Sequence, residues 1–160
     1  ITLRPTDYIN FSIESSNEYK PGSMQWVGIV EDENGPNIIY SNVLRKQTNT
    51  ELRLNVAFSS KMTFEAYYQP FKVEMDYKDY NRLVREKSFD LEPYNYDTDK
   101  DFKIDNRVGT FVFRWEYLPG SLIYAVYNLN DNNYYSYQDG KWDPSQSNSL
   151  FIKIDRFFQL

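Results

Sequence analysis

The chain contains no cysteine and no histidine among its 160 residues. The absence of cysteine excludes disulfide bonds, thiolate nucleophiles and zinc sites built on cysteine ligands. The absence of histidine removes the side chain that most often acts as a general base or a metal ligand. These two absences narrow the catalytic and metal chemistry that the chain can carry.

Long hydrophobic runs are also missing, because no segment approaches the roughly 20 apolar residues of a transmembrane helix. A mean hydropathy of -0.71 is typical of a soluble protein. It also fits a transmembrane β-barrel, whose strands carry polar side chains at alternate positions. The net charge of -5 provides no basic surface for nucleic acid, so we expect no nucleic-acid partner.

Aromatic residues are abundant, at 18% of the chain with 15 tyrosines and 11 phenylalanines. This exceeds what a small core needs and suits either the aromatic belts of a membrane protein or a sugar-binding surface. The sequence starts at Ile1 rather than at a methionine. We therefore expect more protein upstream of it.

Alternation of apolar and polar side chains predicts an all-β, antiparallel fold. The pattern is clearest where Leu52 and Leu54 alternate with Glu51 and Arg53. Strands are predicted at residues 7–19, 24–31, 37–45, 50–59, 62–69, 107–117, 121–129 and 147–160. The last of these is an amphipathic strand with a near-terminal phenylalanine, an ending typical of bacterial outer-membrane barrels.

The predicted connections are asymmetric. Counted back from the C-terminus, short turns at Ser60 and at Pro119-Gly120 fall on one side, and long loops at residues 73–106 and 130–147 fall on the other. Transmembrane barrels show this arrangement. Upstream, short connections are expected near residues 21 and 46, and a short helix is predicted at residues 76–88. We expect residues 1–160 to be a single β-barrel domain or the C-terminal part of one.

The alternation assigns side chains to two faces. In a barrel the apolar set would face lipid: Leu52, Leu54, Phe64, Phe111, Phe113, Trp115, Ile152 and Ile154. The charged set would form a salt-bridged network in the lumen: Glu51, Arg53, Glu65, Arg114, Glu116, Lys153 and Asp155. In a soluble sandwich the charges would face water and the apolar faces would form the core. Alternation alone leaves both interpretations open.

Three stretches carry a more specific signal: residues 51–58 (ELRLNVAF), 64–71 (FEAYYQPF) and 113–121 (FRWEYLPGS). They resemble the C-terminal outer-membrane β-barrel domain of unknown function that follows a family-nine-like carbohydrate-binding domain in Gram-negative bacteria. The resemblance spans residues 38–160 and does not include the carbohydrate-binding domain. It implies an antiparallel up-and-down barrel in the bacterial outer membrane, with this chain forming the C-terminal strands of a larger barrel. Residues 72–75 depart from it, because Lys-Val-Glu-Met stands where small residues and a glycine are expected.

The expected function is that of an outer-membrane protein that binds or takes up a glycan or another small solute. Its expected partners are the lipid bilayer, a glycan, and an upstream domain or other outer-membrane chains. A soluble all-β ligand-binding module and an outer-membrane glycoside hydrolase are the alternatives. The candidate ligand-contact loop has the composition of a sugar-stacking surface and carries Tyr134, Tyr135, Tyr137 and Trp142.

No catalytic residue, cofactor or metal site is predicted. The lumenal carboxylates could act as paired acids and bases, but mid-strand charges on neighbouring polar faces more often form salt bridges. An acidic stretch has the alternate spacing of a calcium loop and contains Asp97, Asp99, Asp101 and Asp105. Phe102 occupies the position of the required glycine and Val108 that of the bidentate glutamate, so we interpret the stretch as a solvated loop.

Overall fold

The computed structural model describes residues 1–33 and 35–158, which form one antiparallel sheet. Its strands are β1 (Thr2–Thr6), β2 (Ile9–Asp32), β3 (Gly35–Ser59), β4 (Met62–Leu83), β5 (Leu91–Pro93), β6 (Phe102–Leu118), β7 (Ser121–Ser136), β8 (Lys141–Gln146) and β9 (Ser149–Asp155). Their spatial order is β1-β2-β3-β4-β6-β7, with β8 and β9 both on the far side of β7 and β5 beside β4. The all-β, antiparallel prediction is confirmed.

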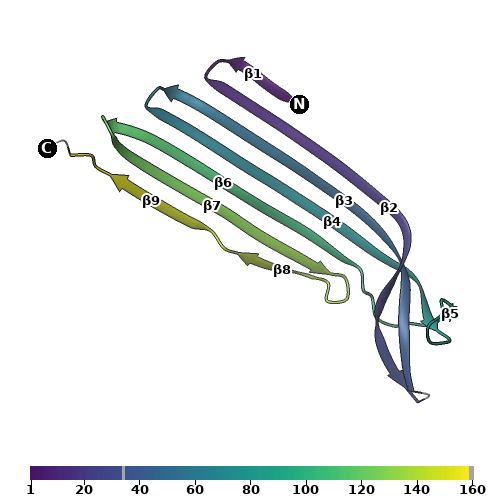
Figure 1. The fold of residues 1–160 in the computed structure, drawn as a ribbon. Helices are drawn as coiled ribbons and strands as arrows, with labels where there is room; N and C mark the ends of the chain where they lie inside the picture. The colour runs from purple at the N-terminus through teal and green to yellow at the C-terminus, as the bar shows by residue number, and fades with distance from the viewer. Residues whose placement is uncertain (34, 159–160) are drawn as a thin grey trace.

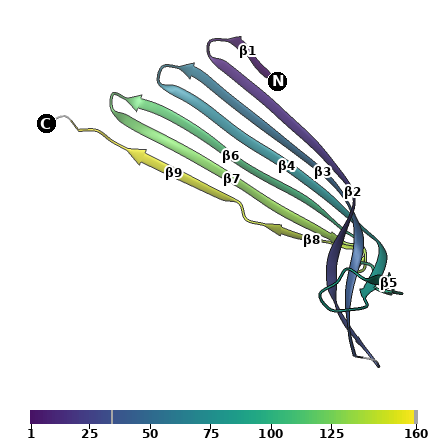
Figure 2. The same cartoon turned by 45° about the vertical axis from the view of Figure 1, so that its right-hand side comes forward.

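The sheet is a single curved layer that stays open (Figure 1). The two edges, β1 with β2 on one side and β8 with β9 on the other, lie on opposite sides of the layer in both views (Figure 2). Within the described residues, no backbone pairing joins these edges. A closed barrel needs about eight strands. The path from β1 to β9 passes only through β2, β3, β4, β6 and β7, so it contains fewer strands than that. The predicted closed barrel is therefore not present in this chain by itself.

Strands β2 and β3 are each longer than predicted. The connections expected near residues 21 and 46 are wrong, because β2 runs through Pro21 and β3 runs through Lys46. The register between the two strands shifts between Lys20 and Ser23, and Gly22 has a φ of 57°. This is a β-bulge, which accommodates a proline without ending the strand.

Strand β4 continues to Leu83, so the helix predicted at residues 76–88 is wrong. Pairing of β4 with β3, β5 and β6 overrides the local helical spacing. The connection between β4 and β6 is consequently residues 84–101, shorter than the predicted loop at residues 73–106. Most of residues 130–147 likewise forms the β7–β8 hairpin rather than a loop.

The terminal strand is also shorter than predicted. Strand β9 covers Ser149–Asp155, and residues 156–158 are not part of it. Residues 159 and 160 of the predicted strand lie outside the described residues. No helix in residues 1–33 and 35–158 is long and apolar enough to cross a membrane.

Very few side chains are buried in this layer. Among the described residues, the buried apolar side chains are Ile39 and Val43 on β3 and Val73 on β4. By contrast, Ile152 is 64% exposed and Ile154 is 65% exposed. Apolar surface is favourable only when it is removed from water, so the broad face of the sheet requires a covering layer.

The connections segregate to the two ends of the sheet. The turns β1–β2, β3–β4 and β6–β7 all lie at one end (Figure 1). The β4–β6 connection and the β7–β8 turn lie at the other end. We call these the short-turn end and the long-connection end.

Candidate functional site

One face of the sheet is apolar from β2 to β9. Directly paired residues of an antiparallel sheet point to the same side, so the register defines the face. One row joins Val56, Phe64, Phe113, Ala125 and Ile152. All of the predicted lipid-facing side chains lie on this apolar face, namely Leu52, Leu54, Phe64, Phe111, Phe113, Trp115, Ile152 and Ile154.

The opposite, polar face carries the charges. One of its rows joins Arg53, Tyr67, Thr110 and Asn128. The structure places all of the predicted lumenal charges on this face, namely Glu51, Arg53, Glu65, Arg114, Glu116, Lys153 and Asp155. The segregation is not complete, because the row that contains Glu65 continues through Val112, Val126 and Phe151.

A connected set of contacts crosses β3 and β4 on the polar face. Arg53 forms an ion pair with Glu51 at 3.2 Å and lies 4.6 Å from the ring centroid of Tyr67. The Tyr67 hydroxyl donates to Gln69 Oε1 at 2.8 Å, and Gln69 Nε2 donates to Asn49 Oδ1 at 2.7 Å. A cation, an aromatic ring and amides therefore present hydrogen-bonding groups side by side.

The remaining predicted charges do not form one network. Lys153 pairs with Asp155 at 2.9 Å within β9, and Glu116 Oε1 accepts a hydrogen bond from the Gly120 backbone at 2.9 Å. Among the residues that the structure describes, no ion pair involves Glu65 or Arg114. The pairs that do form join residues of one strand at the surface, where each contributes little to stability.

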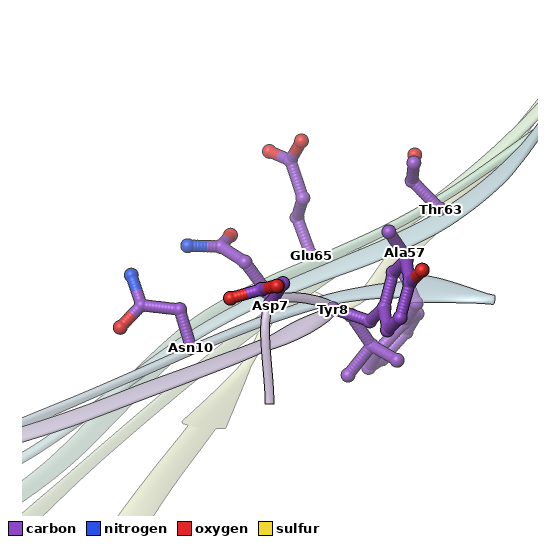
Figure 3. A pocket seen from close by; sticks show the side chains of 9 residues that line it. Asp7, Tyr8, Asn10, Ala57, Thr63 and Glu65 are labelled. Carbon is purple, nitrogen blue, oxygen red and sulfur yellow. The ribbon is translucent and has the colours of Figure 1, made fainter. Parts of the chain in front are cut away.

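A small hollow of about 180 Å³ lies beside the β1–β2 turn. Figure 3 shows Glu65 and Thr63 projecting from the same side of the sheet, with Asn10 and Asp7 beside them. The Oδ1 atom of Asn10 is buried and has no hydrogen-bond partner among the described residues. The hollow therefore offers hydrogen-bond acceptors to a small polar group.

The glutamates considered for acid–base chemistry are far apart. Glu65 is paired with Val112, and Glu116 lies further along the same neighbouring strand. At about 3.3 Å per residue, the two backbone positions are roughly 13 Å apart. The carboxyl groups of glycoside hydrolases are about 5 to 9.5 Å apart. The register therefore argues against Glu65 and Glu116 as a catalytic pair.

The acidic stretch makes local hydrogen bonds. Asp101 Oδ1 accepts from the Tyr77 backbone at 2.6 Å, and Asp99 Oδ1 accepts from the Asp101 backbone at 2.8 Å. Burial raises the pKa of Asp101. Asp105 pairs with Lys72 at 3.3 Å. In the described part of the chain, no group of acidic residues is arranged to hold a metal ion.

The candidate ligand-contact aromatics divide between the two faces. Tyr135 packs against Tyr137 with ring centroids 5.0 Å apart and against Trp142 at 5.2 Å. Tyr134 lies on the opposite, polar face, where it packs against Phe102 at 5.4 Å. Consecutive strand residues point to opposite sides, so the predicted loop cannot bind one ligand with all of its aromatics.

Trp142, which packs against Tyr135, lines a hollow of about 400 Å³ at the long-connection end of the apolar face. We call this the basic hollow. Lys103 lies between Glu74, at 2.7 Å, and the ring of Tyr137, at 5.1 Å from its centroid. The hydrogen bond from Lys103 lowers the pKa of Glu74, which stays ionised. The side chains and backbone lining the hollow belong to Lys46, Thr48, Lys72, Val73, Glu74, Lys103, Ile104, Asp105 and Trp142.

The sequence reasoning missed the basic hollow. Lysines and carboxylates alternate at Lys72 and Glu74 and again at Lys103 and Asp105. This period-two pattern could have indicated paired strands. It was overlooked because Glu74, Lys103 and Asp105 fell inside the loop predicted at residues 73–106, and Lys72 directly preceded it.

These features define an antiparallel, single-layer β-sheet protein with one apolar face and one polar face. The chain belongs to a family described as a domain of unknown function (DUF5916), whose model matches residues 1–157. This agrees with the part of the expected resemblance that concerned an uncharacterised domain. Comparisons with curated proteins and with solved structures found no match.

Proposed function

We propose that this chain forms part of an outer-membrane β-barrel that binds or takes up a glycan or another small solute. The observation that carries the proposal is the continuous apolar face from β2 to β9, backed by a charged and amide-rich polar face. In a barrel the apolar face contacts lipid and the polar face lines the lumen.

The apolar face also ends at one level on neighbouring strands. Its last row joins Leu52, Tyr68, Gly109 and Leu129. Beyond that row the same face becomes polar. From Gly109 to Tyr117 the apolar segment of β6 is about nine residues long, which fits the 9–11 residues of a transmembrane strand. The strands continue past this level with charged groups on the same face, whereas the opposite face there carries Val73, Ile104 and Tyr134 in one row.

The open edges require further strands in this proposal. Unpaired backbone groups in hydrocarbon cost several kcal/mol each, and β9 carries the exposed side chains of Leu150, Ile152 and Ile154 at one edge of the sheet. We propose that strands outside this chain, from the same protein or from other outer-membrane chains, complete the barrel. The upstream carbohydrate-binding domain expected from the resemblance belongs to the same proposal.

The polar face provides chemistry for a sugar or a similar solute. Arg53, Tyr67 and Gln69 form a run of cation, ring and amide. Further along the sheet, Thr110 donates to Asn128 Oδ1 at 3.1 Å. Hydroxyl-rich solutes are bound by such planar polar groups combined with aromatic rings. We propose this region as the solute-contacting surface of the lumen.

The open sheet equally favours a second candidate, a soluble all-β ligand-binding module. In that case a second layer of protein covers the apolar face, as in a sandwich. The test is membrane insertion of the full-length protein. We expect it to partition into detergent, to show heat-modifiable gel migration and to resist extraction from membranes by alkaline carbonate. Recovery in the aqueous phase with unchanged migration would contradict the barrel and support the soluble module.

The glycoside hydrolase alternative has a separate test. The full-length protein is assayed on a panel of glycosides beside Glu65→Gln and Glu116→Gln. From the wide spacing of these carboxylates we expect no turnover that either substitution removes. Turnover abolished by either change would establish the hydrolase and contradict the interpretation based on the register.

A further inference from the structure

We propose that the basic hollow and an adjoining hollow bind the phosphorylated saccharide headgroup of an outer-leaflet glycolipid. This inference rests on the proposed barrel, because it places the apolar face against lipid. The adjoining hollow has a volume of about 320 Å³ and shares Asp105 and Trp142 with the basic hollow. Its other lining residues are Arg107, Asp131, Asn133 and Gln146.

The position of the two hollows identifies the membrane as the source of the ligand. Side-chain parity is unbroken along β4 and β6, so Lys72 and Asp105 point to the same side as Phe64 and Phe111. Lys72 lies four residues beyond Tyr68, which belongs to the last apolar row. The distance along the strand is about 13 Å, which corresponds to roughly 10 Å along the membrane normal at a strand tilt of about 40°. The headgroup layer on each side of a bilayer is roughly 5–8 Å deep, so Lys72 lies at its outer margin.

The charges suit a phosphate. Cations from three strands converge on the two hollows, namely Lys46 on β3, Lys72 on β4, and Lys103 and Arg107 on β6. The carboxylates of Glu74 and Asp105 hold them in place through ion pairs, with Lys103 at 2.7 Å and Lys72 at 3.3 Å respectively. Three carboxylates, Glu74, Asp105 and Asp131, face these four cations. One positive charge therefore remains in a chain whose net charge is -5.

The same surface suits a sugar ring. Trp142 lies between the hollows and is 48% exposed. An aromatic face of this kind packs against the apolar side of a saccharide. Asp131 Oδ1 is a buried atom without a hydrogen-bond partner among the described residues. It is available to accept a hydrogen bond from a sugar hydroxyl or amide, as Asn133 and Gln146 can also do.

A lipid headgroup explains this combination better than a transported solute. A solute that passes through the lumen meets the polar face, whereas both hollows lie on the apolar face beyond its last apolar row. A glycolipid whose acyl chains lie along the apolar face brings its phosphate and sugar to this level. The hollows therefore extend the lipid contact surface and are separate from the proposed lumen site.

The test measures binding of a bis-phosphorylated, acylated glucosamine disaccharide to the full-length protein in phosphatidylcholine vesicles. A fluorescent form of this glycolipid reports binding by energy transfer from tryptophan. We expect wild-type protein to prefer it to phosphatidylcholine. The double variant Lys72→Gln with Lys103→Gln should bind it roughly tenfold more weakly, because charge-assisted hydrogen bonds to phosphate are lost.

The matched control is Lys61→Gln with Lys100→Gln, which removes the same charge from the β3–β4 turn and from the β4–β6 connection. It should bind as wild type does. Trp142→Ala should weaken binding, and Trp142→Phe should retain most of it. Because both variants lack a tryptophan that contributes to energy transfer, their binding is measured by the amount of labelled lipid that stays on the purified protein. Equal binding by the hollow double variant and its control would overturn the inference.

Two further outcomes separate this inference from the proposed function. Insertion is recorded for every sample by heat-modifiable migration. Normal insertion of wild-type protein without preference for the glycolipid would overturn the hollows as a headgroup site and leave the barrel standing. Full competition by the same disaccharide without acyl chains would overturn the membrane source of the ligand. Failure of wild-type protein to insert would overturn both proposals.

Discussion

The substitution Phe113→Arg places a charge at the centre of the apolar face. Phe113 is paired with Phe64 on one side and with Ala125 on the other, and it lies midway along the apolar segment of β6. If this segment crosses a bilayer, Phe113 lies near the midplane. An arginine there should cost about 2–4 kcal/mol of stability, and the cost should fall to about 0–1 kcal/mol near the interfaces.

The assay is urea unfolding of the full-length protein in vesicles, followed by tryptophan fluorescence. Trp115→Arg, closer to the short-turn end, should cost less than Phe113→Arg. The matched control is Val112→Arg, which introduces the same side chain on the polar face beside its partner Glu65. An arginine facing a water-filled lumen and a carboxylate should change stability by well under 1 kcal/mol, in the range of a surface substitution.

Equal costs for Phe113→Arg and Val112→Arg would refute the assignment of the two faces. A larger cost for Val112→Arg would reverse it. Labelling provides an independent check, since the chain has no native cysteine. A water-soluble thiol reagent should react more slowly with Phe113→Cys than with Arg114→Cys in intact membranes, and equal rates would also refute the assignment.

Three other predictions follow from local geometry. Gly120→Ala should destabilise the protein by about 1–2 kcal/mol in urea unfolding, because φ is 73° and a Cβ would lie 3.1 Å from that of Phe157, whereas Gly28→Ala meets open space and should change stability much less. Burial raises the pKa of Tyr80 to about 12, so the unfolded phenol ionises first and stability should fall between pH 10 and pH 12 less steeply in Tyr80→Phe than in wild type. Deletion of residues 157–160 should abolish insertion, because it removes the terminal segment whose Phe157 backbone donates to Ser121 Oγ at 3.0 Å, and normal heat-modifiable migration of the truncation would contradict the barrel.

The assignment of side chains to faces was predictable from the sequence because strand parity is a local property. Leu52 and Leu54 alternate with Glu51 and Arg53, and any regular strand places them on opposite sides. Directly paired residues of neighbouring strands point to the same side of the sheet, so the apolar set and the charged set each continue from strand to strand. The prediction extended over β3, β4, β6 and β9 for this reason, without information about which strands are neighbours.

Strand length and strand number were less predictable because they depend on pairing. Pro21 indicates a break when it is considered alone, but a bulge with Gly22 allows β2 to continue against β3. Tyr77 and Tyr80 are spaced as on a helix, yet β4 continues because β3, β5 and β6 supply backbone partners. The sheet of the described residues is open, and closure is a matter of strand pairing, which no local pattern could establish.

The basic hollow was hidden for the same reason. Its cations come from β3, β4 and β6, and only the register brings Lys46 and Lys103 onto Glu74. Trp142 joins them through β7 and β8. The sequence contains each of these residues, but their proximity follows only from strand pairing. The prediction of a loop at residues 73–106 removed that pairing.

The most direct test of the central claim uses spin labels at successive positions of β6 from 109 to 117 in the full-length protein in vesicles. Accessibility to oxygen, which concentrates in lipid, and to a water-soluble nickel chelate is measured at each position. We predict two opposite period-two patterns, with oxygen collisions high at 111, 113 and 115 and nickel collisions high at 112, 114 and 116. Low accessibility to both reagents at 111, 113 and 115 would contradict the account, because it would place the apolar face in a protein core rather than against lipid.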